Sequence, residues 1–71
     1  MKRETAVDIN ALVLVYGSKL DSSLNEMKSS ASADDFKRYR ETVAKLMEIM
    51  LFEVMNPIYK EYPDLRPKKL T

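Results

Sequence analysis

The chain has no cysteine, histidine or tryptophan among its 71 residues, and it has a single glycine. Without cysteine, neither a disulfide nor a thiolate metal site can form. Without histidine, the most frequent general base and the commonest neutral metal ligand are also missing. We therefore expect a non-enzymatic protein without a cofactor or a metal. An enzyme or metal-binding bundle is the least favoured of three hypotheses.

An excess of charge of one sign is also missing, since 12 basic residues face 11 acidic ones and the net charge is +1. No overall field attracts the chain to nucleic acid or to an anionic membrane. The uncharged stretch Ile9–Ser18 is much shorter than the roughly 20 apolar residues that span a bilayer. We expect a cytoplasmic protein that retains its N-terminus.

Proline is missing until the end of the chain, because all three prolines lie between Asn56 and Pro67, in NPIYKEYPDLRP. The preceding sequence favours helices. Thr5 and Asp8 resemble a capping box, and apolar residues recur after them at helical steps. This stripe consists of Ile9, Val13, Tyr16, Leu20, Leu24 and Met27. It predicts a first helix over residues 5–28.

The small, polar residues 29–34 predict a turn, and Ser32 with Asp35 repeats the capping pattern. A second helix is expected over residues 35–55, with the stripe Phe36, Tyr39, Val43, Leu46, Met50 and Val54. Pro57 cannot continue this helix without losing a hydrogen bond. Asn56 as N-cap and Pro57 as first helical residue predict a short helix over 57–62, followed by an extended tail over 63–71.

These elements predict one all-α domain over residues 1–71, in which the two long helices form an antiparallel hairpin. Facing residues then have numbers that sum to about 63, so Gly17 lies near Met47. Gly17 itself has three interpretations: a gap that admits Met47, a break in the first helix, or a close approach by a ligand.

Apolar residues on a second face of each helix exceed what one hairpin can bury, and soluble monomers rarely expose so large a patch. We therefore expect a homodimer that forms a four-helix bundle. The alternative is a three-helix monomer in which the tail folds back. The predicted dimer or partner interface consists of Val7, Leu14, Val15, Ile49, Phe52, Met55, Tyr59 and Tyr62.

The tyrosines of the tail have two interpretations. They close the open end of the bundle, which we favour, or they form a recognition element for a partner, because tyrosine is enriched at interface hot spots. The preferred function is a small protein-interaction module, such as an adaptor, inhibitor or regulatory subunit, that acts as a helical homodimer with an unidentified protein partner.

The alternative function is a nucleic-acid-associated regulator that uses Lys37, Arg38 and Arg40. Acidic residues one turn away weaken this hypothesis, since they favour intrahelical ion pairs over a free basic face. Asp34 is expected to pair with Lys37 and Arg38, which leaves Arg40 without an acidic neighbour at helical spacing.

Overall fold

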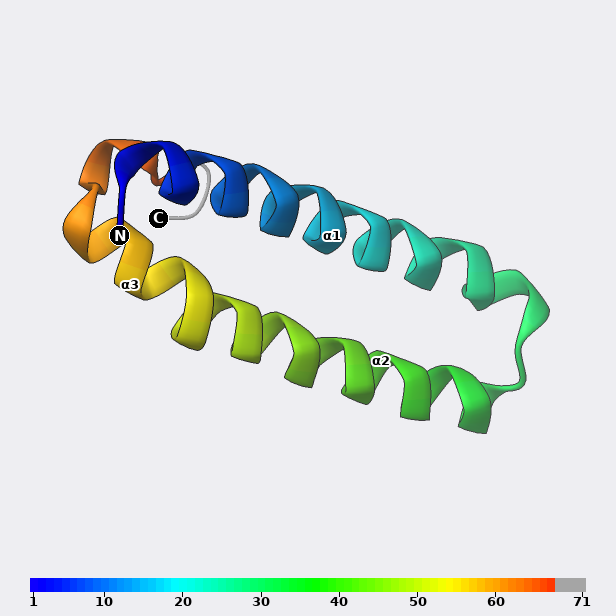
Figure 1. Ribbon diagram of the computed structural model, residues 1–71. Helices are drawn as coiled ribbons and strands as arrows, with labels where there is room; N and C mark the ends of the chain where they lie inside the picture. Colours follow the sequence, from blue (N-terminus) through cyan, green and yellow to red (C-terminus); the bar gives the residue numbers. More distant parts are fainter. Residues whose placement is uncertain (68–71) are drawn as a thin grey trace.

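The structure is a computed structural model that describes residues 1–67, and these residues contain helices and no strand. The protein is therefore all-α, as the sequence predicts. Two long helices, α1 (Arg3–Ser30) and α2 (Ala33–Ile49), precede the π-helical segment η1 (Met50–Met55). The short helix α3 (Asn56–Glu61) and the 3₁₀ turn η2 (Pro63–Leu65) follow (Figure 1).

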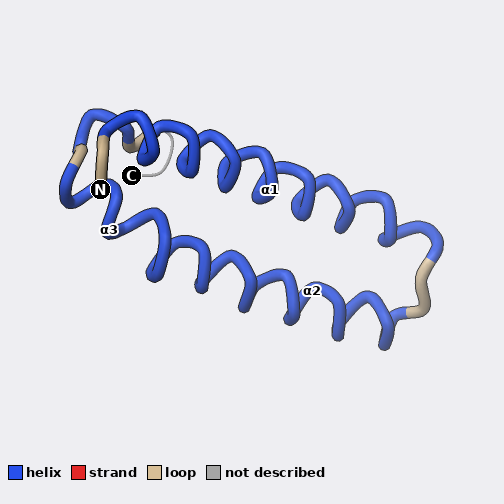
Figure 2. The backbone as a smooth tube through the Cα atoms, in the orientation of Figure 1, coloured by secondary structure: helices blue, strands red, loops and turns tan. Residues whose placement is uncertain are grey.

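The chain runs out along α1, reverses at Ala31 and Ser32, and returns beside it along α2 (Figures 1 and 2). The Ser32 side chain accepts a hydrogen bond from the Asp35 backbone N–H over 3.1 Å, so the predicted N-cap of the second helix is confirmed. The Ser23 and Tyr39 hydroxyls, 2.6 Å apart, link the two helices near the turn.

The first helix begins before its predicted cap. Thr5 lies inside α1, and Lys2 occupies the N-cap position without a side-chain hydrogen bond. Tertiary packing explains the longer helix, because Ala6 in its first turns is fully buried and Arg3 is bonded to Asp64 near the other end of the chain.

The second helix changes type instead of stopping before Pro57. In an α-helix the ring of Pro57 would press on the Glu53 carbonyl and leave it without its usual donor. The wider turns of η1 shift the pattern, and the Asn56 N–H donates to the Leu51 carbonyl, five residues earlier. Asn56 is therefore a helical residue and not the predicted N-cap.

The tail is also more helical than predicted. Pro63–Leu65 form a 3₁₀ turn closed by a 3.0 Å bond from the Leu65 N–H to the Tyr62 carbonyl, where an extended chain was expected. The Leu65 carbonyl is held by Asn10 of α1, so packing on the first helix selects the turn. Residues 68–71 of the predicted extended tail lie outside the described residues.

The hydrophobic core lies at the end of the helix pair away from the turn. It consists of Ala6, Met55, Ile58 and Tyr59, and Ile9, Val13, Val54, Tyr62 and Leu65 pack around it. On α2, the buried residue is Val43, which is 2% exposed. The middle of the molecule thus has little buried volume of its own.

The molecule is long and thin, with extents of 44 × 20 × 16 Å and a radius of gyration of 14.3 Å. A compact domain of this length has a radius of gyration of about 11 Å. α1 and α2 lie side by side as a single layer (Figure 1). Within residues 1–67, no helix has the length and apolar character needed to cross a membrane.

Candidate protein-interaction surfaces

Residues 56–65, which comprise α3 and η2, fold over the first turns of α1, and we call them the C-terminal cover (Figure 1). Beneath it, the Tyr59 hydroxyl donates to Asn10 Oδ1 at 2.5 Å, and Asn10 Nδ2 donates to the Leu65 carbonyl at 3.3 Å. Both Tyr59 and Asn10 are buried. Burial raises the pKa of the Tyr59 hydroxyl, and the positive charge of Arg66 partly offsets this.

The rim of the cover carries charged and polar contacts. Arg3 forms an exposed ion pair with Asp64, and its guanidinium lies 5.5 Å from the centroid of the Tyr62 ring. The hydrogen bond from Arg3, followed by its charge, lowers the pKa of the Asp64 carboxyl. The Tyr62 hydroxyl donates to the Met1 carbonyl at 2.6 Å. The cover is therefore attached to α1 along both its buried and its exposed edges.

The predicted interface residues fall into two groups. Five are exposed on the surface: Val7, Leu14, Val15, Ile49 and Phe52. Met55 and Tyr59 are each only 7% exposed and belong to the chain's own core, so they are not available to a partner in this conformation. Tyr62 is half-buried at the edge of the same core. Their burial follows from the fold-back of the cover.

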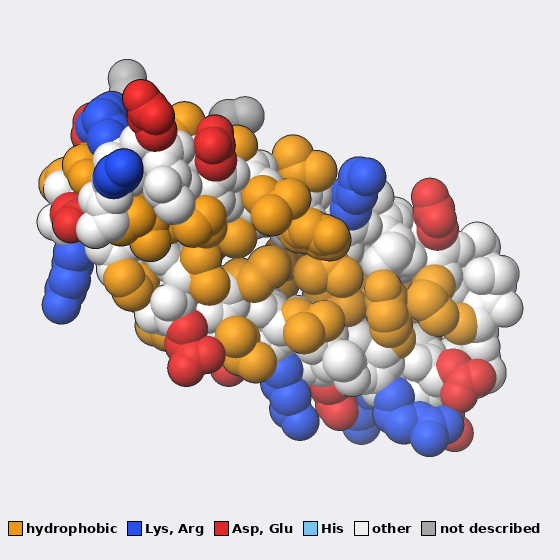
Figure 3. Space-filling view, viewed as in Figure 1, with side chains coloured by type: hydrophobic (Ala, Val, Ile, Leu, Met, Phe, Trp, Pro, Cys, Tyr) orange, Lys and Arg blue, Asp and Glu red, His pale blue; other side chains and the backbone are white. Residues whose placement is uncertain are grey.

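A patch of large exposed hydrophobic side chains lies halfway along the helix pair. Leu12 and Tyr16 are one turn apart on α1, and Leu46 and Ile49 are one turn apart on α2. Because Met47 lies beside Gly17, these two pairs of residues lie at the same height along the two antiparallel helices. We call these four residues the mid-helix patch. Figure 3 shows apolar side chains gathered along the line where the helices meet, with charged groups at the outer edges.

A groove of about 830 Å³ opens between α1 and the α2–η1 segment. It is lined by Val13, Leu14, Gly17, Ser18, Asp21, Met47, Met50, Leu51 and Met55. Leu14 follows Leu12 by two residues, about 200° around a helix, so the groove and the mid-helix patch open on opposite sides of the pair. The middle of this single layer is therefore apolar on both sides.

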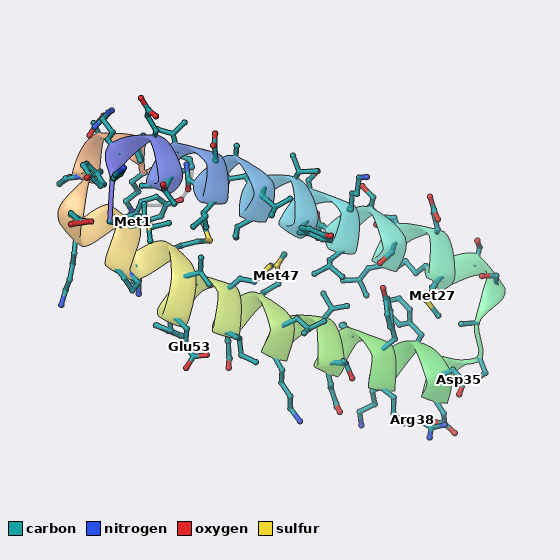
Figure 4. All side chains as sticks on the ribbon, in the orientation of Figure 1. Met1, Met27, Asp35, Arg38, Met47 and Glu53 are labelled. Carbon is teal, nitrogen blue, oxygen red and sulfur yellow. The ribbon has the colours of Figure 1, made fainter. Side chains whose placement is uncertain are left out.

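Gly17 forms part of the groove wall and does not break α1, which continues to Ser30. Figure 4 shows the Met47 side chain between the two helices. A Cβ added at Gly17 would lie 3.7 Å from Met47 Sδ and 3.8 Å from Met47 Cε, which is ordinary van der Waals contact. Packing in this conformation therefore has room for alanine and does not require glycine.

The basic residues of α2 are partly neutralised. Arg38 forms an ion pair at 3.0 Å with Asp35, not with the Asp34 that the spacing suggested. Lys37 and Arg38 line a shallow depression together with Asp34 and Glu41. The guanidinium of Arg40 lies 5.9 Å from the centroid of the Phe36 ring. The three basic residues thus stand among carboxylates and an aromatic ring.

Sequence reasoning missed Asn10 and Asp21. It also missed the mid-helix patch except for Ile49, which was part of the predicted interface. Asn10 could have been predicted, because it lies between Ala6 and Val13 at helical spacing and a polar group on that face needs a buried partner. Asp21 could also have been predicted as an unpaired carboxylate, since no basic residue lies three or four positions from it in α1.

Among residues 1–67, no three acidic side chains come close enough together to hold a metal ion. The chain matches no known protein-family model, and neither the curated proteins nor the solved structures contain a significant match to it. The physical character of the two apolar surfaces is therefore the basis for a functional proposal.

Proposed function

We propose that this protein is a non-enzymatic protein-interaction module whose helix hairpin dimerises through the mid-helix patch into a four-helix bundle. The observation that supports this most is the exposure of the patch. Leu12, Tyr16 and Ile49 are each more than half exposed, and Leu46 is 43% exposed. Helix pairs that bury such side chains against a second pair form the core of a four-helix bundle.

The exposed area supports the same proposal. The chain exposes 5636 Å². A compact monomer of 8.2 kDa exposes about 4,500 Å². The excess of roughly 1,100 Å² is similar to the about 800 Å² that each partner contributes to an interface of standard size. A second copy on the mid-helix patch therefore removes part of this excess surface.

A dimer of this kind leaves the groove open on the outer side of each helix pair, and an open apolar surface suits an adaptor or regulatory subunit that holds another protein. The hydrogen bonds of the cover favour closure of the core as its role, since they fix Tyr59 inside the chain. The surface for a partner is then the groove and not the tail.

Light scattering on a sizing column tests the dimer at tens of micromolar protein. The wild type is expected at twice 8.2 kDa. Leu12→Glu with Ile49→Glu is expected at the monomer mass, because two buried carboxylates per chain would be left without partners. A monomeric wild type contradicts the proposal.

Val15→Glu is the matched control. Val15 is 52% exposed, like the patch residues, but Val13 and Gly17 on either side of it line the groove towards α2. Two residues correspond to about 200° around a helix, so Val15 points to the outer side of α1, away from α2, and lies about 100° around the helix from the patch residue Tyr16. This variant is expected to remain a dimer, with helical circular dichroism equal to that of the wild type.

A further inference from the structure

The groove has a feature that the fold of the free chain does not explain. A glycine inside a helix destabilises it by about 1 kcal/mol relative to alanine. The neighbouring Met47 atoms leave room for the alanine methyl group at 3.7 and 3.8 Å. The absence of a side chain at Gly17 therefore serves no contact within the hairpin. It does allow an occupant of the groove to approach the backbone of α1.

The groove walls indicate the chemistry of that occupant. Met47 and Met50, which are partly exposed, supply flexible, polarizable side chains that adapt to apolar groups of different shape. Asp21 at the other end is the charged residue of the lining. Within residues 1–67 no ion pair or hydrogen bond involves its carboxylate. The groove is thus apolar along most of its length and negative at one end.

The length of the groove indicates the form of the occupant. From Val13 to Asp21 it follows eight residues of α1, which is about 12 Å at the rise of an α-helix. This accommodates two turns of a third helix, whose apolar residues four apart face the methionines and whose next turn reaches Asp21. Between its ends an α-helix pairs its own backbone groups, so such an occupant needs no backbone hydrogen bonds from the apolar groove.

We propose that the groove binds an amphipathic helix of a partner protein, with apolar side chains four residues apart in the groove and a lysine or arginine paired with Asp21. This proposal rests on the protein-interaction function above but not on the dimer, since the groove and the mid-helix patch lie on opposite sides. Gly17 sets the depth of the site, and Asp21 sets the direction in which the helix lies.

Two synthetic helical peptides test the proposal by fluorescence anisotropy with the full chain. Both carry leucines four residues apart in an alanine-rich helix, and one has lysine four residues after the second leucine where the other has glutamate. The lysine peptide is expected to bind the wild type more tightly by about two- to fivefold, the range of a partly exposed ion pair. Asp21→Asn is expected to remove this preference.

Gly17→Leu is expected to weaken binding of both peptides at least tenfold, because its side chain fills the groove. Gly17→Ala is the control for folding, and its thermal unfolding midpoint is expected to rise. Equal binding of the lysine peptide by wild type and Gly17→Leu overturns the proposal, as does a wild type that binds neither peptide.

The sizing column separates this proposal from the dimer. If Gly17→Leu remains a dimer while it loses the peptide, the groove is a partner site as proposed. If Gly17→Leu becomes a monomer, the groove is occupied by a second copy of the chain, and the partner-helix proposal is wrong. A monomeric wild type that still binds the lysine peptide through Asp21 contradicts the dimer alone.

Discussion

At the scale of single residues, the Asn10–Tyr59 pair fixes the relative position of the two ends of the chain. A buried amide is stabilising only when its hydrogen bonds are satisfied, and here both its oxygen and its nitrogen have partners in the C-terminal cover. Within residues 1–67, no buried side-chain nitrogen or oxygen lacks a partner. The pair therefore selects one docking of the cover on α1.

Tyr59→Phe is expected to lower the free energy of unfolding by about 1–3 kcal/mol, because it leaves Asn10 Oδ1 buried without a donor. Urea unfolding followed by circular dichroism measures the change. Tyr62→Phe, which removes a hydroxyl at the exposed edge, is the control and is expected to cost less. An unchanged midpoint for Tyr59→Phe contradicts a stabilising role for the pair.

The pH dependence of stability provides a second check. Burial raises the pKa of Tyr59 above its ordinary value of 10.0, so the folded state favours the neutral hydroxyl. Its contribution is therefore fully present below pH 10 and is lost as pH rises through the folded-state pKa. The wild type is expected to lose more stability than Tyr59→Phe between pH 9 and about 12, as measured by urea unfolding.

At the scale of elements, the start of α2 depends on one side chain. The Ser32 hydroxyl accepts a hydrogen bond from the Asp35 N–H. Asp34 and Asp35 lie in the first turn, where the helix dipole favours negative charge. Ser32→Ala is expected to destabilise the protein by about 1 kcal/mol in urea unfolding. Ser30→Ala is the matched control, because its hydroxyl only bonds back to the Glu26 carbonyl at 3.5 Å and is expected to change stability less.

The attachment of the C-terminal cover to α1 also depends on pH. Because the Arg3 hydrogen bond lowers the pKa of Asp64, the pair stabilises the folded state above the ordinary aspartate pKa of 3.8. This stabilisation is lost as pH falls through the lowered value. In Arg3→Gln, the pKa of Asp64, measured by carboxyl NMR titration, is expected to rise towards its ordinary value. An unchanged pKa in this variant contradicts the pairing.

At the scale of the whole molecule, a single layer of two helices cannot enclose a core along its full length. Within residues 1–67, the compact apolar cluster lies at the end closed by the cover, while the middle is apolar on both sides. Small chains often gain the missing stability from a second subunit. The proposed dimer gives the middle of the helix pair the burial that it lacks.

The unfolding temperature is therefore expected to rise with protein concentration, since a dimer is stabilised by mass action. Differential scanning calorimetry over a hundredfold range of concentration measures this. The Leu12→Glu, Ile49→Glu variant is expected to unfold at one lower temperature that does not change with concentration. A wild-type midpoint independent of concentration contradicts a dimer that is coupled to folding.

The sequence alone determined the helical class, the turn and the N-cap at Ser32, because apolar periodicity and capping act over three or four neighbouring residues. The tertiary structure decided the rest. The burial of Met55 and Tyr59, the earlier start of α1 and the groove beside Gly17 all depend on contacts between distant parts of the chain. Local spacing does not encode such contacts, since they form only when segments far apart in the sequence pack against each other.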